Sequence, residues 1–279
     1  MSGAARGPGQ DHRRSPALPA ATLHARLTGL ERRIREALAT RRDALPFGEM
    51  LVTGDLPLVY DHNLVLVDAP APAHEVIATV EDRARTAGWG HRNVETADPA
   101  IADALRAEFL AAGYREERFV TMALLRPPQA AAPVTATGAT TAVVDIAAQE
   151  PLARALLAEE PWAQRADVLD QFAERERRIA RVVPARAVVA PADDPASRCL
   201  LLSDGALADI DAVATLTSHR GAGLSRAVMR RAVAEARADG AEHIMLVADD
   251  RDWPRQWYGR LGFVEVGRVT QFRRWPEPA

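Results

Sequence analysis

The chain has 279 residues, of which 48% are hydrophobic, and a formal net charge of −3. This length allows one large domain or two ordinary ones, and the charge argues against a basic surface that binds nucleic acid. The single cysteine, Cys199, excludes an internal disulfide framework and CxxC-type metal sites. All 35 basic residues are arginines, so no lysine serves as a Schiff base, a general base or a P-loop phosphate ligand.

In chain order, residues 1–20 lack an apolar signal-peptide core and are expected to form a disordered tail. No apolar run is long enough to span a membrane, so we expect a cytoplasmic protein without a membrane partner. Hydrophobic periodicity then predicts one α/β unit. Its elements are a helix at 21–42, strands at 48–53 and 63–69, a helix at 73–87, a strand at 91–97, a helix at 99–112 and a strand at 114–125.

Residues 128–140 are rich in proline, alanine and threonine, which is typical of an interdomain linker. A second α/β unit follows. Its elements are a strand at 141–146, helices at 150–159 and 166–181, strands at 185–190, 198–203 and 207–215, a helix at 224–239, a strand at 243–249, a helix at 253–260 and a final β segment at 263–274.

The ends of the two units resemble each other. The segment "FLAAGYREERFVTMALLRP" (109–127) aligns with "YGRLGFVEVGRVTQFRRWP" (258–276). The same offset of 149 residues separates Gly113 from Gly262 and Thr121 from Thr270. Both segments end a strand, helix, strand, helix order, so the sequence predicts a tandem repeat.

A glycine loop, "RGAGLS" (220–225), joins the strand that ends at Thr215 to the helix that begins at 224. The free N–H groups of a helix N-terminus attract anions, and glycines let a phosphate approach them closely. Arg220 adds a fixed cation with forked donors. The alternative is a tight turn that needs glycine only for its backbone angles. A Walker loop is excluded by the absence of lysine, and a dinucleotide fingerprint by Arg226 at its third glycine position.

"RGAGLS" resembles the Q/R-x-x-G-x-G/A pyrophosphate loop of the GCN5-related N-acetyltransferase (GNAT) superfamily, and "WYGRLGFVEVG" (257–267) resembles the closing segment of that family. The resemblance implies a mixed α/β fold with a degenerate GNAT-like domain at 21–127 and a complete one at 141–279. It implies acetyl-CoA as co-substrate, no metal, and a small-molecule or peptide amine as acceptor, in a monomer or homodimer. The alternative function is an idle acyl-CoA-binding or scaffolding protein.

The resemblance also implies roles for particular residues. Backbone N–H groups of Gly221, Ala222, Gly223, Leu224 and Ser225, together with Arg220, would hold the pyrophosphate. The backbone of Val213, Ala214 and Thr215 would pair with the pantetheine arm, and Tyr258 would protonate the leaving thiolate.

A base must accept a proton from the amine. Asp209 and Asp211 lie two apart on one strand and therefore share a face. Asp211 is the candidate nearer the reaction centre, with Glu174, Glu176 and His219 as rivals. The remaining histidines show no metal-ligand spacing and are expected to be surface or packing residues. In the first unit, Phe109 replaces Tyr258, and the loop at 68–75 carries two prolines and no glycine pair. We therefore expect the first unit to form a wall of the acceptor site and to bind no CoA productively.

Overall fold

The structure is a computed structural model that describes residues 18–127 and 138–275. Most of the predicted tail and most of the predicted linker therefore lie outside the described residues. The first half contains α1 (Ala20–Leu38), β1 (Arg41–Leu45), β2 (Gly48–Val52), the 3-10 turn η1 (Tyr60–His62), β3 (Leu64–Val67), α2 (Ala73–Thr86), β4 (Arg92–Thr96), α3 (Pro99–Ala111) and β5 (Arg115–Leu124).

The second half repeats this pattern after two additional elements, β6 (Ala142–Val144) and α4 (Glu150–Ala158). It continues with η2 (Pro161–Ala163), α5 (Ala166–Val182), β7 (Ala185–Ala190), β8 (Ser197–Asp204), β9 (Leu207–Thr215), η3 (Thr217–His219), α6 (Leu224–Ala238), β10 (His243–Asp249), α7 (Pro254–Arg260) and β11 (Phe263–Arg274). The predicted elements therefore exist, and the one exception to the prediction is an additional strand.

The exception is β1, which the sequence placed within a helix at 21–42. The helix ends at Leu38 and the chain becomes extended at Ala39. Arg42 then pairs across the β1–β2 hairpin with Glu49, with 2.7 Å between Nε and Oε1. The cross-strand ion pair and the hairpin ladder stabilise a strand that the arginine-rich sequence alone does not indicate.

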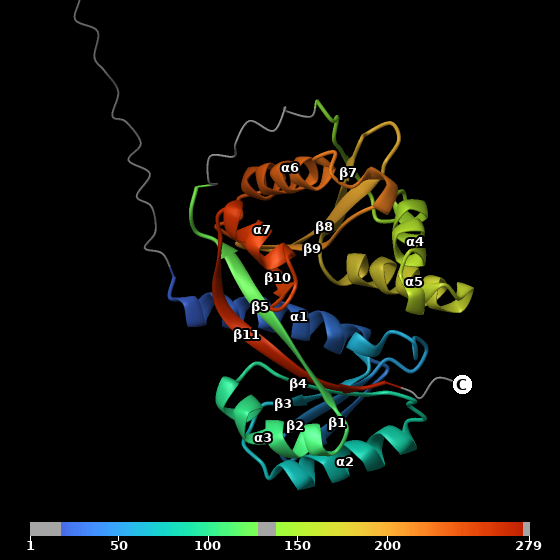
Figure 1. The fold of residues 1–279 in the computed structure, drawn as a ribbon, viewed down its shortest axis with the longest axis vertical. Coiled ribbons are helices and arrows are strands. Elements are labelled where there is room, and N and C mark those ends of the chain that lie inside the picture. Colours follow the sequence, from blue (N-terminus) through green and yellow to red (C-terminus); the bar gives the residue numbers. More distant parts are fainter. Residues whose placement is uncertain (1–17, 128–137, 276–279) are drawn as a thin grey trace, which may run out of the picture.

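All strands belong to one mixed sheet in the order β1-β2-β3-β4-β11-β5-β10-β9-β8-β7-β6 (Figure 1). The two halves exchange their last strands. β11, the end of the second half, lies between β4 and β5 and pairs antiparallel with both. β5, the end of the first half, lies between β11 and β10. Each half therefore completes the sheet of the other.

The internal repeat predicted from the sequence is present in three dimensions. β5 and β11, which carry the repeated segments, pair antiparallel at the centre of the sheet. Gly113 and Gly262, the matched glycines before these strands, both have positive φ, 83° and 99°. Only glycine adopts such angles readily, which explains why both copies have it at the turn between helix and strand.

Four groups of helices cover the sheet, one of them being α4 and α5, which pack beside α1. α6 and α7 pack over the second half, where Val228 and Met229 are fully buried, and α2 and α3 pack over the first. α1 crosses the junction of the two halves (Figure 1), burying a stripe at Leu23, Leu27, Leu30, Ile34 and Leu38. A Cβ at Gly267 of β11 would lie 2.2 Å from Cγ of His24 in α1, so glycine allows this close crossing. The crossing brings a first-half helix over second-half strands.

Candidate active site

The parallel strands β9 and β10 separate in the middle of the sheet. They pair only from Leu207–Asp209 to His243–Met245, although β9 runs on to Thr215 and β10 to Asp249. Beyond Asp209 the register of β9 against β8 shifts between Arg198 and Leu200, and Ala212 has a φ of 51°. The extra residue is a β-bulge, a device that bends a strand and often lies next to active sites. An opening in the sheet results, with Val213–Thr215 on its β9 side.

The glycine loop predicted as an anion site follows β9 after the short turn η3. Gly221 and Gly223 have φ of 81° and 78°, angles that favour glycine, so the loop also needs these glycines for its backbone conformation. The loop residues 220–222 are also exposed, and a Cβ at Gly221 would meet no atom within 4 Å. Among the described residues, the backbone N–H groups of 221–225 have no hydrogen-bond acceptor, and no side chain caps α6. The first turn of α6 therefore has free donors facing open space.

Two predicted loop side chains make contacts within the protein. Arg220 Nε donates to the Thr215 carbonyl at 3.3 Å, which fixes the arginine stem beside the end of β9. The Ser225 hydroxyl lies 2.6 Å from the Thr215 hydroxyl. Ser225 therefore contributes its backbone to the loop, while its side chain joins the loop to the strand.

Tyr258 lies on α7, on the face of the sheet that α6 covers. Its ring packs in the same buried cluster as Cys199, with ring centroids 6.2 Å from Phe263. The hydroxyl donates no hydrogen bond to any described residue. Burial, the neighbouring Cys199 and Asp211 all raise the pKa of Tyr258, so the hydroxyl keeps its proton at neutral pH.

A cleft of about 310 Å³ opens on the other face of the sheet, beneath α1 and α5. Asp209 and Asp211 of β9 both line it, as predicted from their spacing. They are joined by Glu31 of α1, from the first half of the chain. Asp209 is 5% exposed and its Oδ1 has no hydrogen-bond partner among the described residues. Asp211 Oδ1 accepts the N–H of Ala212 at 2.7 Å.

The crowding of these carboxyls changes how they bind protons. Burial raises the pKa of Asp209 well above its usual range, and the charges of Asp211 and Glu31 raise it further. Burial also raises the pKa of Glu31 to about 7, with opposing contributions from Arg35, which lowers it, and Glu95, which raises it. Glu31 can therefore exchange a proton near neutral pH, which suits a general base or acid.

The remaining charges of the cleft are mostly paired. Arg35 pairs with Glu95, whose other oxygen accepts from Gln271 at 2.6 Å, and Arg273 pairs with Asp61. These pairs link α1, β4 and β11, and they hold the first half against the second.

Arg175 of α5 differs from these arginines. Its Nε donates to Nε2 of His62 at 2.9 Å, and it forms no ion pair with any described residue. His62 was expected to be a surface or packing residue. It is buried, lines the cleft, and its pKa is well below its usual value because of burial and the charge of Arg175.

The other proposed bases lie elsewhere. Glu174 pairs with Arg177 and Arg178 along α5. Glu176 is buried in an ion pair with Arg198, with 2.6 Å between Oε1 and Nη2. His219 is exposed beside Ser218. None of the three lines the cleft, whereas Asp211 does. Burial raises the pKa of Cys199 to about 12, so this thiol is a core residue and no nucleophile at neutral pH.

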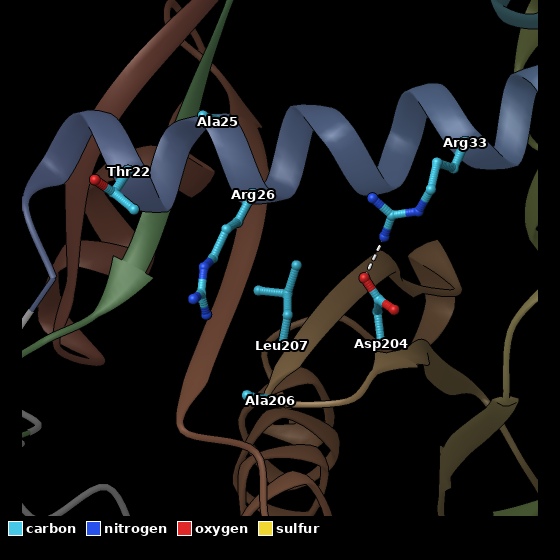
Figure 2. Close-up of a pocket in the computed structure, with 7 residues that line it drawn as sticks. All are labelled: Thr22, Ala25, Arg26, Arg33, Asp204, Ala206 and Leu207. Atoms are coloured by element: carbon cyan, nitrogen blue, oxygen red, sulfur yellow. Dashed lines mark hydrogen bonds and ion pairs between the residues drawn. The ribbon is translucent and has the colours of Figure 1, made fainter. Parts of the chain in front are cut away.

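A second hollow, of about 440 Å³, lies between α1 and the turn that joins β8 to β9 (Figure 2). Arg26 and Arg33 extend from α1 toward this turn, and Arg33 pairs with Asp204. The hollow shares no lining residue with the carboxyl cleft. It offers no group with the perturbed proton binding seen there, so the smaller cleft is the better candidate site.

Within residues 18–127 and 138–275 no group of histidine, cysteine or acidic side chains is arranged to hold a metal ion. No helix in the same ranges is long and apolar enough to cross a membrane.

The opened parallel strands, the glycine loop that follows the first of them and the helix after the loop lie within one α/β unit. Residues 157–263 match the model of the Acetyltransferase (GNAT) family, and this part of the chain is a GNAT domain. A comparison with curated proteins finds no significant match.

Solved structures match almost the whole chain. A GCN5-related N-acetyltransferase from Kribbella flavida is 21% identical, with a TM-score of 0.60 over 95% of this chain and 98% of its own. A tandem GNAT protein from the clavulanic acid biosynthesis pathway is 15% identical, with a TM-score of 0.52 over 94% and 98%. A conserved protein of unknown function from Staphylococcus epidermidis is 12% identical, with a TM-score of 0.66 over 85% and 94%. At these identities the likeness establishes the fold, which is a tandem of two GNAT-like units as predicted.

Three cleft residues were not predicted from the sequence: Glu31, His62 and Arg175. The first two belong to the half without a glycine loop, so no motif indicated them. A usable signal was the buried stripe of α1, because Glu31 and Arg35 flank it at a spacing of four residues.

Proposed function

We propose that the chain transfers an acetyl group from acetyl-CoA to an amine, and that the second half performs the reaction. The observation that supports this most directly is the opening between β9 and β10. It ends at a loop with free backbone donors, and it has Tyr258 on one face and three carboxyls on the other. The GNAT domain at 157–263 contains the loop, Tyr258 and two of the carboxyls.

The residues fit acetyl-CoA. The free N–H groups of 221–225 and the guanidinium of Arg220 would hold the pyrophosphate, because a helix N-terminus and an arginine both favour phosphate oxygens. The backbone of Val213–Thr215 would hold the pantetheine arm on the side where β9 has lost its pairing with β10. When bound, acetyl-CoA supplies an activated thioester carbonyl.

The acceptor amine must lose a proton before it can attack. An alkyl ammonium has a pKa near 10.4, so freeing the amine at pH 7 costs about 4.6 kcal/mol. Asp211 lies at the bulge, where its charge would attract the ammonium. Glu31 faces it from α1 and can take the proton because its pKa is near 7. We assign the base role to Asp211 and Glu31 acting together.

The departing thiolate benefits from a proton donor. The Tyr258 hydroxyl holds its proton at neutral pH and has no other partner among the described residues, so it is available for this role. In the first half, Phe109 occupies the equivalent position and is fully buried. That half would instead form a wall of the acceptor cleft, through Glu31, His62 and Glu95.

The test is an amine panel read by the release of free CoA thiol. The thiol of the protein does not contribute to the signal, because the one cysteine of the chain is fully buried. Turnover that requires both acetyl-CoA and an amine supports the proposal. Tight acetyl-CoA binding without turnover of any amine would instead favour an idle acyl-CoA-binding protein.

A further inference from the structure

The carboxyl cleft carries one guanidinium that no carboxylate neutralises. Of the arginines that line it, Arg35 and Arg273 are paired with Glu95 and Asp61. Arg175 forms no ion pair with any described residue, and only its Nε has a partner, Nε2 of His62. Its two Nη groups therefore have no partner among the described residues.

His62, which also lines the cleft, has a second polar atom without a partner. Its Nε2 accepts from Arg175, so in the neutral ring the proton lies on Nδ1. Nδ1 is buried and has no partner among the described residues, and His62 as a whole is only 2% exposed. A buried donor without an acceptor costs free energy, which a ligand oxygen that reaches Nδ1 would recover.

The position of Arg175 is fixed by the docking of the two halves. Gln171 of α5 accepts the N–H of Leu58 at 2.8 Å, and Arg178 pairs with Asp55 at 2.6 Å. Both contacts lie on the helix face that carries Arg175, because residues 171, 175 and 178 are four and three positions apart. The segment 53–63 of the first half therefore holds Arg175 toward the cleft.

The same cleft holds three acidic side chains without ion pairs. Glu31, Asp209 and Asp211 form no ion pair with any described residue, and two of them lie on β9, where the sheet opens. Asp209 is buried, and its Oδ1 has no hydrogen-bond partner among the described residues, so it can accept a hydrogen bond from a ligand. An amine that is to be acylated must reach the opening between β9 and β10, so its nitrogen belongs beside these carboxyls.

We propose that the acceptor is a small amine that also carries a carboxylate, and that Arg175 and His62 bind this carboxylate while the amine faces Glu31, Asp209 and Asp211. This inference rests on the proposed function. The cleft volume of about 310 Å³ fits a small amino acid. A dication would place positive charge beside Arg175, and a plain alkylamine would leave both donors without acceptors. No covalent step beyond acyl transfer is implied.

The experiment compares straight-chain ω-amino acids from glycine to 6-aminohexanoic acid with the alkylamine and the diamine of matching chain length. We expect at least one amino acid to exceed its matched alkylamine by roughly 10- to 100-fold in kcat/KM, the worth of one or two charge-assisted hydrogen bonds. Arg175→Gln should abolish this preference and raise KM for the amino acid. Arg175→Lys, which retains the charge, should retain part of the preference.

Arg177→Gln is the matched control, because Arg177 is on the same helix but pairs with Glu150 and Glu174 outside the cleft. It should leave the preference for the carboxylate unchanged. Thermal unfolding of each variant shows that the fold is intact. Calorimetric titration of the favoured amino acid into parent and Arg175→Gln protein gives a second reading that needs no turnover.

The outcomes separate the two claims. Alkylamine turnover without any preference for a carboxylate, or a preference that survives Arg175→Gln, refutes the inference and leaves acyl transfer standing. Faster turnover of the diamine than of the amino acid also refutes it. If no amine is acylated and no amino acid binds, the proposed function and the inference both fail.

Discussion

Phe272 offers a direct test of the strand exchange, because it belongs to β11 of the second half but is buried in the core of the first. It is fully buried, and its ring centroid lies 4.8 Å from that of Phe109. Its neighbours in the sheet are Val94 of β4 and Glu116 of β5. Truncation of a buried phenylalanine to alanine removes its transfer free energy and leaves a cavity, a loss of about 3–5 kcal/mol.

We therefore expect Phe272→Ala to lower the free energy of unfolding by about 3–5 kcal/mol, a large part of the roughly 5–15 kcal/mol of an ordinary domain. Urea denaturation gives this value from the shift in midpoint at constant slope. Hydrogen exchange then shows which strands lose protection. Because β11 joins both halves, peptides from β3 and from β8 should lose protection together.

Leu110→Ala is the control. Leu110 lies on α3 of the same half but is 47% exposed, so its truncation should change the free energy of unfolding by no more than about 0.5 kcal/mol. If Phe272→Ala destabilises the β3 peptides and leaves the β8 peptides as protected as in the parent, the two halves unfold independently. The structural account of the exchange would then be wrong.

Three further predictions concern the candidate site. Gly223→Val, which places a β-branched side chain at a φ of 78°, should weaken acetyl-CoA binding by calorimetry at least tenfold, and equal affinity would remove the loop from the site. Tyr258→Phe should lower kcat by about 10²–10⁴ with nearly unchanged acetyl-CoA affinity, and an unchanged rate when chemistry limits turnover would return Tyr258 to packing. Glu31→Gln should remove the rise of kcat/KM through pH 7 that a base with a pKa of about 7 produces. Folding raises the pKa of Glu31 from 4.5, so the free energy of unfolding of the parent should fall as the pH rises from about 4.5 to 7. At pH 8, Glu31→Gln should therefore be more stable than the parent by up to about 3 kcal/mol. If parent and variant show the same dependence of stability on pH, the assignment of Glu31 is wrong.

Local patterns were enough to predict most of this fold. Periodicity and glycine positions indicated the elements from β2 to β11, and the 149-residue offset between Gly113 and Gly262 indicated the repeat. The exchange of β5 and β11 could not be predicted, because the two strands have similar sequences and either one could pair with the sheet of either half. Long-range contacts distinguish the two arrangements: Phe272 packs against Phe109, Gln271 bonds Glu95 and Arg273 pairs with Asp61.

The same limit applies to the site. Asp209 and Asp211 were predicted to share a face, and both line the cleft. Glu31, His62 and Arg175 reach it through the crossing of α1 and the docking of residues 53–63 on α5, contacts between residues more than a hundred positions apart. The pKa of Glu31 is raised mainly because its neighbours bury it, and this burial cannot be predicted from the local sequence around Glu31.

The place of β11 in the sheet also has a consequence for the order in which the protein is made. The first half emerges from the ribosome long before residues 263–274 are synthesised, yet β11, which contains these residues, is the strand that lies between β4 and β5. Until then β4 keeps one edge without a partner, and β5 keeps both until β10 is made, and such edges are prone to pair with other chains. Folding of the first half must therefore wait for the end of translation or proceed while those edges are protected. Slowing elongation within the second half should then increase aggregation of the nascent chain, and it should do so before the glycine loop has been synthesised.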